Sequence, residues 1–225
     1  MTAVAAAGRG TTAPATGRGT TLVLAVLMPV GPALVLMLRL LLPGFTADGA
    51  TQSAAAVAQS PGRESAVLWL GYLATLTLVP GVIAAGALAR RGAPRLATWA
   101  VALLVPAYLS MGALITGDAV LWSGQRAGLS PATTGAVYDD LHPSIGLAVG
   151  VFVLGHVVGT VLLGLALLRS RTISAPIAWA LTISQPLHFV AFVVLGIQAL
   201  DVVAWGLTTI GTAAAAVALV RRNGR

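Results

Sequence analysis

The sequence predicts an all-α protein, a polytopic transmembrane helix bundle of six spans with both termini in the cytoplasm. The first observation is composition: 57% of the 225 residues are hydrophobic and only 8% are charged, whereas a soluble domain carries about a quarter charged residues. The second is a set of six apolar segments, each long enough to cross about 30 Å of hydrocarbon as a helix. The third is the placement of arginine between these segments, which follows the positive-inside rule.

The chain divides into two tails and six spans. Residues 1–20 are rich in Gly, Thr and Ala, and we expect them to form a flexible cytoplasmic tail. The first apolar run is about twice as long as the core of a signal peptide, so we expect it to be retained as a span. The predicted spans are about 21–42, 66–89, 96–117, 144–168, 174–196 and 201–220, and 221–225 form a second cytoplasmic tail.

The charges determine the predicted orientation. With the N-terminus inside, ten of the thirteen arginines lie on the cytoplasmic side and all six acids lie outside. The ten arginines are Arg9, Arg18, Arg90, Arg91, Arg95, Arg169, Arg171, Arg221, Arg222 and Arg225. Because only Lys and Arg count in the positive-inside rule, this pattern indicates a multi-pass protein of the plasma membrane.

Some large side chains near the predicted span ends are expected to lie at the membrane interface. Arg39 is close to the outer end of the first span, from which its side chain can extend toward water. Trp69, Trp99, Trp179 and Trp205 each fall near a predicted span end, where amphipathic rings are enriched.

Several classes of protein are disfavoured. The net charge is +7, but the arginines are not gathered on one face or helix, so we expect the lipid bilayer and not nucleic acid as the partner. The chain has no Cys, which excludes thiolate metal sites, iron–sulfur clusters and cysteine nucleophiles. No serine lies in a G-x-S-x-G context, so we assign no catalytic residue and favour a protein that is not an enzyme.

The fourth span is rich in glycine. Gly146 and Gly150 form one GxxxG pair, and Gly155 and Gly159 form another on nearly the opposite face. Because both faces allow close approach of a helix, we predict that this span lies in the middle of the bundle. The same glycines are candidates for contact in a homo- or hetero-oligomer.

The segment Ser184–Phe192, SQPLHFVAF, places polar residues inside the fifth span. Ser184, Gln185 and His188 share one helical face, and Pro186 leaves the carbonyl of residue 182 without its helical donor. His156 lies at a similar depth on the fourth span. We therefore predict a candidate binding pocket between spans four and five, lined by His156, His188, Gln185 and Ser184.

Three functions remain open for this pocket. The first is transport or binding of a small-molecule ligand. The second is a membrane redox function, with one b-type haem held by the two histidines. The third is a non-catalytic accessory subunit, in which the polar groups only join helices.

A second polar group lies outside the spans, in the loop before the fourth span. Asp139, Asp140 and His142 have the chemistry of a cation site. We interpret Asp140 as the N-cap of the fourth span, Asp139 as a complement to its positive end and Pro143 as a first-turn residue. Asp201 is interpreted as the N-cap of the sixth span for the same reason. We therefore expect no cofactor and no metal site outside the haem alternative.

Two segments carry a resemblance. The stretch from Ala56 to Ala97, which includes LATLTLVPGVIAAGALARR, and the stretch from Gly155 to Phe192 resemble small six-span integral membrane proteins of actinobacteria. That group has no established activity. The resemblance implies six spans and a bacterial plasma membrane, and it assigns no site residue.

Overall fold

The structure is a computed structural model that describes residues 17–46 and 48–223. Most of the predicted first tail and the last two residues lie outside this part of the chain. The long helices are α1 Arg18–Leu41, α3 Pro61–Ala89, α4 Pro94–Arg126, α6 Pro143–Arg169, α7 Ala175–Phe189 and α8 Gln198–Asn223, and α7 continues as a π-helix, η1 Val190–Leu195. No strand occurs among the described residues, so the predicted all-α class is confirmed.

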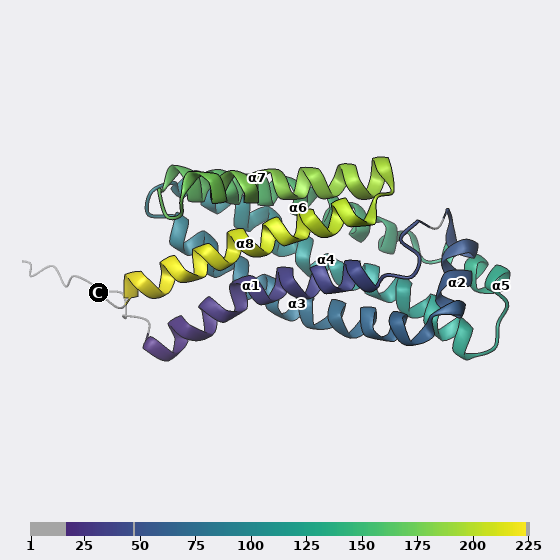
Figure 1. Cartoon of the computed structure of the whole chain (residues 1–225). Helices are drawn as coiled ribbons and strands as arrows, with labels where there is room; N and C mark the ends of the chain where they lie inside the picture. The colour runs from purple at the N-terminus through teal and green to yellow at the C-terminus, as the bar shows by residue number, and fades with distance from the viewer. Residues whose placement is uncertain (1–16, 47, 224–225) are drawn as a thin grey trace, which may run out of the picture.

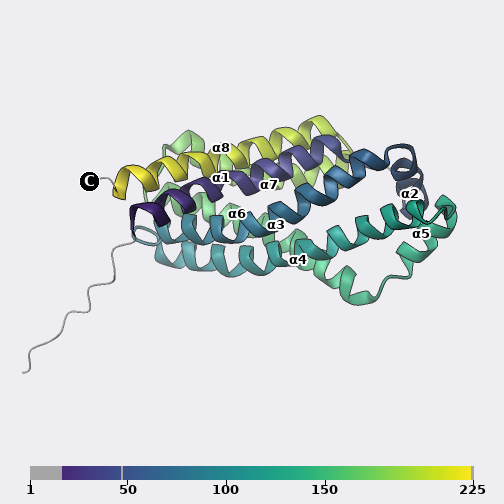
Figure 2. The same ribbon diagram turned by 90° about the horizontal axis from the view of Figure 1, so that it is seen from below.

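These helices form a closed ring. In the order α1, α3, α4, α6, α7 and α8, each helix packs against the next, and α8 packs against α1 (Figures 1 and 2). Within residues 17–46 and 48–223, six candidate spans are long and apolar enough to cross a bilayer, which is typical of a multi-pass membrane protein. Three of the five connections are short, those from α3 to α4, from α6 to α7 and from η1 to α8, and short connections favour antiparallel neighbours.

The two long connections contain helices that the sequence analysis did not predict. They are α2 Ala50–Gln59 and α5 Pro131–Asp139, which pack against each other and against α4 beyond one end of the ring (Figure 1). Ala54, Val57 and Leu121 form a small separate core there. In addition, α4 continues to Arg126, beyond the predicted end of its span at residue 117.

The two ends of the ring differ in charge. The end where α1 begins and α8 ends carries Arg18, Arg90, Arg91, Arg95, Arg169, Arg171, Arg221 and Arg222, and we call it the arginine end. The opposite end, next to α2 and α5, carries all six acids of the chain, and we call it the acidic end. That the arginine end faces the cytoplasm stays a prediction from the positive-inside rule.

The two glycine pairs of α6 have different surroundings. A Cβ on Gly155 would lie 2.8 Å from Ala107 Cβ of α4, and one on Gly159 would lie 2.6 Å from Leu104. No atom lies within 4 Å of the Cβ positions of Gly146 and Gly150. The predicted central position of this span is therefore corrected: α6 is one member of the ring, between α4 and α7.

Candidate functional site

Three aromatic rings from three helices meet inside the ring of helices. His156 of α6 lies with its ring centroid 5.4 Å from that of His188 on α7, and the centroid of Trp205 on α8 lies 6.2 Å from the first and 5.5 Å from the second. His156 is 0% exposed and His188 is 8% exposed. Both histidines therefore face the interior, as a polar group in a lipid-exposed bundle should.

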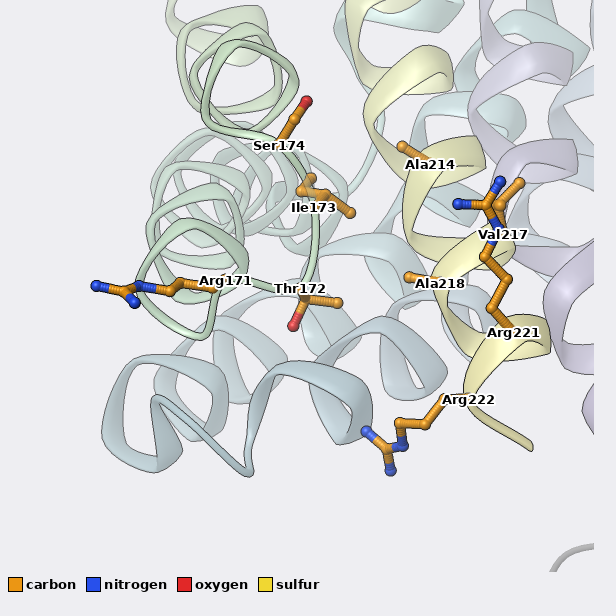
Figure 3. A pocket seen from close by; sticks show the side chains of 9 residues that line it. All are labelled: Arg171, Thr172, Ile173, Ser174, Ala214, Val217, Ala218, Arg221 and Arg222. Carbon is orange, nitrogen blue, oxygen red and sulfur yellow. The ribbon is translucent and has the colours of Figure 1, made fainter. Parts of the chain in front are cut away.

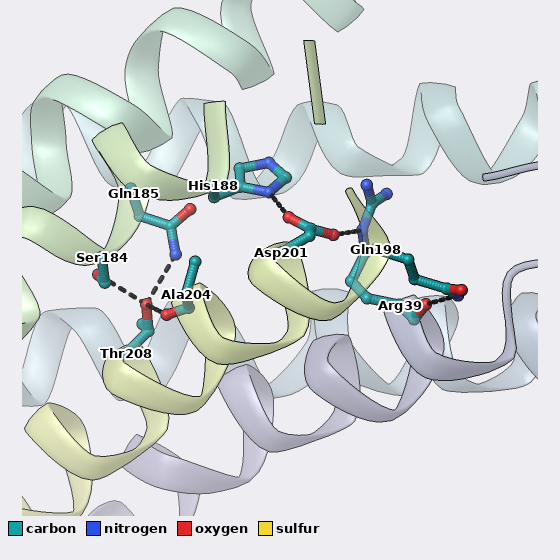
Figure 4. Close-up of polar contacts among 8 residues, drawn as sticks. All are labelled: Arg39, Ser184, Gln185, His188, Gln198, Asp201, Ala204 and Thr208. Atoms are coloured by element: carbon teal, nitrogen blue, oxygen red, sulfur yellow. Dashed lines mark hydrogen bonds and ion pairs between the residues drawn. The ribbon is translucent and has the colours of Figure 1, made fainter. Parts of the chain in front are cut away.

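A buried ion-pair network adjoins these rings. Asp201 of α8 is 0% exposed; its Oδ2 lies 2.5 Å from Arg39 Nε of α1, and its Oδ1 is bonded to His188 Nδ1 (Figure 4). Since an ionised carboxylate only accepts hydrogen bonds, both nitrogens donate to it. The guanidinium carbon of Arg39 also lies 4.1 Å from the ring centroid of Phe192, within the range of a cation–π contact.

The network corrects three interpretations made from the sequence. Asp201 is not an N-cap, because α8 begins at Gln198 and Asp201 N donates to Ile197 O within the first turn. Arg39 does not extend to the interface, because Asp201 supplies a buried counter-charge. Trp205 is 1% exposed and lies against the histidines, whereas Trp69 is 66% exposed.

Ser184 and Gln185 belong to a hydrogen-bond chain between α7 and α8. Gln185 Nε2 donates to Thr208 Oγ1 at 2.7 Å, and Thr208 Oγ1 donates to Ser184 Oγ at 2.8 Å (Figure 4). Ser184 Oγ in turn donates to the carbonyl of Leu181 at 2.7 Å. All of these side chains are buried. The predicted site residues are therefore brought together, although α8 and α1 contribute as much to the cluster as spans four and five.

Several buried polar atoms of this cluster have no hydrogen-bond partner. They are His156 Nε2, Gln185 Oε1, Trp205 Nε1 and Arg39 Nη2. His156 Nδ1 donates to the Phe152 carbonyl at 2.6 Å, which leaves Nε2 of the neutral ring as an acceptor. Gln185 Oε1 is also an acceptor, whereas Trp205 Nε1 and Arg39 Nη2 are donors. A bound group at this cluster therefore finds both kinds of partner.

A small cavity lies next to the cluster, toward the arginine end. Its volume is about 20 Å³, and its polar lining consists of Tyr108, Thr160, Thr208 and Thr212. A space of about this size holds one water molecule. Thr160 is 2% exposed and lines the cavity beside Tyr108. Thr208 belongs both to this cavity and to the chain from Gln185, so the two polar regions adjoin.

The backbone of α7 explains how the aromatic groups are placed. Pro186 does not end the helix, which continues to Phe189 and then widens into η1. The π-helix ends at Gly196, whose φ of 64° suits a residue without a side chain. Phe192, on this π-turn, stacks on His188 with centroids 6.1 Å apart. Such π-turns occur frequently at functional sites.

The two histidine rings are not arranged to hold a haem. A haem held by two histidines lies between imidazoles on opposite faces of one porphyrin plane. Here the two imidazoles lie 5.4 Å apart and are tilted by 52°, and Phe152 packs on His156 with centroids 4.4 Å apart. These side chains do not fit a haem unless the rings separate, so no chemistry is derived through one.

The loop before α6 has a different capping pattern from the predicted one. His142 is the N-cap of α6, and its Nδ1 accepts a hydrogen bond from Ser144 N at 3.3 Å. Asp140 is the C-cap of α5 and not an N-cap. Pro143 does occupy the first turn of α6, as expected for a residue without an N–H. The described residues contain no group of three or more His, Asp or Glu side chains arranged to hold a metal ion.

Sequence reasoning missed five residues of the interior: Arg39, Glu64, Asp201, Trp205 and Thr208. Glu64 is 1% exposed in the first turn of α3, whereas the predicted second span begins after it, at residue 66. Asp201 lies three residues inside α8, and Arg39 lies inside α1. The sequence signal for the ion pair of Arg39 and Asp201 is that one span carries an arginine and another carries an acid near the same end.

Comparison with known proteins gives no match: no family model fits the chain, and no curated protein or solved structure resembles it. The resemblance to small actinobacterial membrane proteins stays a prediction.

Proposed function

We propose that the chain is a plasma-membrane protein that binds or transports a small polar ligand at the cluster of Arg39, His156, His188, Asp201 and Trp205. The observation that carries the proposal is the set of buried, unpartnered polar atoms around an ion-pair network. Buried polar atoms without partners are rare in folded proteins and point to a bound water, ion or ligand. Polar and ionisable groups inside a membrane protein are functional candidates for the same reason.

The free-energy cost of burying the charged groups of the cluster favours a functional role over a purely structural one. Removing charges from water costs several kcal/mol per ion, which their mutual attraction only partly offsets. An apolar pair of similar volume joins helices without that penalty. The accessory-subunit alternative explains the bonded groups, such as Gln185 and Thr208, but it does not explain why His156 Nε2 has no partner.

The size of the interior bears on the ligand. The cavity beside the cluster has a volume of about 20 Å³, which admits a ligand no larger than water in this form of the protein. A proton carried by His188 and Asp201, or by water between the polar groups, meets this limit. A larger molecule enters only if helices separate, and the π-turn of α7 is a place where the helical hydrogen bonds are already rearranged.

The proposal is tested in proteoliposomes that contain a pH-sensitive dye and the wild-type protein, His156→Leu or His142→Leu. His142 is exposed outside the ring, so His142→Leu is the matched control. We expect proton flux, or a co-purified small molecule in native mass spectrometry, for wild type and the control, and its loss in His156→Leu. Absence of both signals in wild type, or their persistence in His156→Leu, contradicts the proposal.

The same preparation distinguishes the alternatives. A b-type haem gives a strong visible absorbance band that disappears in both His156→Leu and His188→Leu. An accessory subunit co-purifies with a second protein in a fixed ratio and gives no flux.

A further inference from the structure

A cationic hollow lies at the arginine end, far from the buried cluster. Its volume is about 770 Å³, and it lies between the turn that joins α6 to α7 and the last turns of α8 (Figure 3). One part of its lining is polar or charged: Arg171, Thr172, Ser174, Arg221 and Arg222. The other part is apolar: Ile173, Ala214, Val217 and Ala218. The hollow therefore combines positive charge with a hydrocarbon wall.

A second hollow adjoins the first. It has a volume of about 250 Å³, shares Thr172, Ala218 and Arg222 with the first hollow, and adds Arg91 and Ser170. The two hollows together are therefore bordered by four arginines. All six acidic side chains of the chain lie among the described residues of the acidic end, so none is available to neutralise these arginines. Gathered like charges repel one another and attract an anion.

The backbone of Arg171, which lines the hollow, adopts a left-handed conformation that is unfavourable for a residue with a side chain. Its φ is 51°, and it is the only non-glycine residue with positive φ among the described residues. It occupies the left-handed position after α6: Arg171 N donates to Leu168 O at 3.0 Å, and Thr172 N donates to Leu167 O at 3.1 Å. Glycine is the usual residue at this position of the motif. The backbone conformation alone therefore favours glycine at this position.

The beginning of α7 adds positive potential. Ser174 is the N-cap of α7 and lines the hollow, yet its side chain makes no capping hydrogen bond. Its hydroxyl therefore remains available to a ligand. The N-terminus of a helix carries a partial positive charge and free N–H groups, which favour a phosphate. This feature acts together with the arginines and does not define the site by itself.

We infer that this hollow binds the phosphate of an anionic phospholipid. The guanidinium groups of Arg171, Arg221 and Arg222 point in different directions in Figure 3, so these long side chains turn toward the phosphate on binding. Ser174 adds a hydroxyl, and the wall of Ile173 and Val217 takes the upper part of an acyl chain. The position agrees with this occupant, because the candidate spans of α6 and α8 end at Arg169 and Arg222, where lipid headgroups meet the protein. Basic pockets between helices at one membrane face bind anionic headgroups by the same chemistry. Free phosphate satisfies the charge but leaves the apolar wall exposed to water.

The test is a lipid titration of the full chain in detergent, followed by native mass spectrometry. Phosphatidylglycerol, with a net negative headgroup, is compared with zwitterionic phosphatidylcholine and with inorganic phosphate alone. The variants are the double change Arg221→Gln with Arg222→Gln, the single change Arg171→Gly, and Arg95→Gln as the control. Arg95 is exposed at the same end and lines neither hollow. Arg171→Gly removes the guanidinium and keeps a residue suited to the left-handed turn, so it preserves the fold.

We expect wild type to bind phosphatidylglycerol more tightly than phosphatidylcholine. An arginine near the surface contributes about fivefold in affinity for an anionic lipid. Arg171→Gly should therefore weaken binding about fivefold and the double change about 25-fold, with less than about twofold for the control. Equal affinity for the two lipids overturns the inference, as does an equal loss in Arg95→Gln. Tight binding of inorganic phosphate that excludes the lipid overturns the choice of a phospholipid.

Discussion

Arg39 and Asp201 are 162 positions apart in the sequence, yet Arg39 Nε lies 2.5 Å from Asp201 Oδ2 inside the bundle. The pair joins α1, the first helix, to α8, the last, and so reinforces the contact that closes the ring. His188 is bonded to the other oxygen of the same carboxylate. Asp201 is therefore the residue through which α1, α7 and α8 are connected by charge.

The first prediction concerns this carboxylate. Asp201→Asn removes the carboxylate bonded to Arg39 and leaves Asp118 as a second, non-bonded acid that acts on it, so we expect a loss of about 3–5 kcal/mol in unfolding free energy. The exposed Asp139 provides the control, and Asp139→Asn should change stability by less than about 0.5 kcal/mol. Adding Arg39→Leu to Asp201→Asn should recover part of the loss, because the unpaired cation is then absent. Reversible unfolding in detergent measures all four proteins; equal losses in both Asn variants contradict the network.

The second prediction concerns the donor to Asp201. His188→Leu leaves Asp201 Oδ1 without its donor, and we expect a loss of about 1–3 kcal/mol. Gln retains a donor and an acceptor, so His188→Gln should retain most of the stability. Unfolding midpoints of the two variants provide the comparison. If Leu and Gln prove equally stable, the hydrogen bond to Asp201 contributes nothing.

The third prediction uses the two glycine pairs of α6. A Cβ on Gly155 meets Ala107 Cβ at 2.8 Å and Leu103 O at 3.0 Å, so Gly155→Ala should cost about 1–3 kcal/mol by forcing α4 and α6 apart. Gly150→Ala places its Cβ in open space and should stabilise the helix by about 0.5–1 kcal/mol. Thermal unfolding of both variants measures the difference. A loss at Gly150 as large as that at Gly155 indicates an additional contact on the outer face of α6.

The fourth prediction is the orientation in the membrane. The chain has no Cys, so a single Cys can be introduced at exposed positions: Gln52 and Ala132 at the acidic end and Arg171 at the arginine end. On intact cells, an impermeant maleimide should label positions 52 and 132, and position 171 only after lysis. Labelling of position 171 on intact cells reverses the proposed topology.

The sequence was sufficient to predict the six spans because each is a long apolar run with arginines or loops at its ends. Helices α2 and α5 were missed because they are short and their hydropathy is moderate, so no membrane-length signal marks them. The inner part of the site was predicted because Ser184, Gln185 and His188 share one helical face. All three residues are buried in the structure, as that shared face predicts.

The charged part of the site was not predicted, for a physical reason. The sequence position of a charged residue near a span end is consistent with two structures. The side chain can lie at the interface in contact with water, or it can be buried beside a partner on another span. When Arg39 and Asp201 are considered separately, the sequence favours a position at the interface for each of them. The buried, paired arrangement becomes evident only from the closure of the ring, which brings α1 next to α8. Trp205 was misassigned for the same reason.

The thermal stability of His156→Leu in detergent tests the central claim most directly, that the cluster is maintained for a ligand and not for the fold. His156→Leu removes two opposing contributions: the penalty of the buried, unpartnered Nε2, about 1–3 kcal/mol, and the hydrogen bond from Nδ1 to the Phe152 carbonyl, about 0.5–1.5 kcal/mol. We predict that the unfolding free energy of His156→Leu equals that of wild type or exceeds it by up to about 2 kcal/mol. Such a result is expected when a residue is retained for function although it lowers stability. A loss of more than about 2 kcal/mol would contradict the account and assign His156 to the structural core.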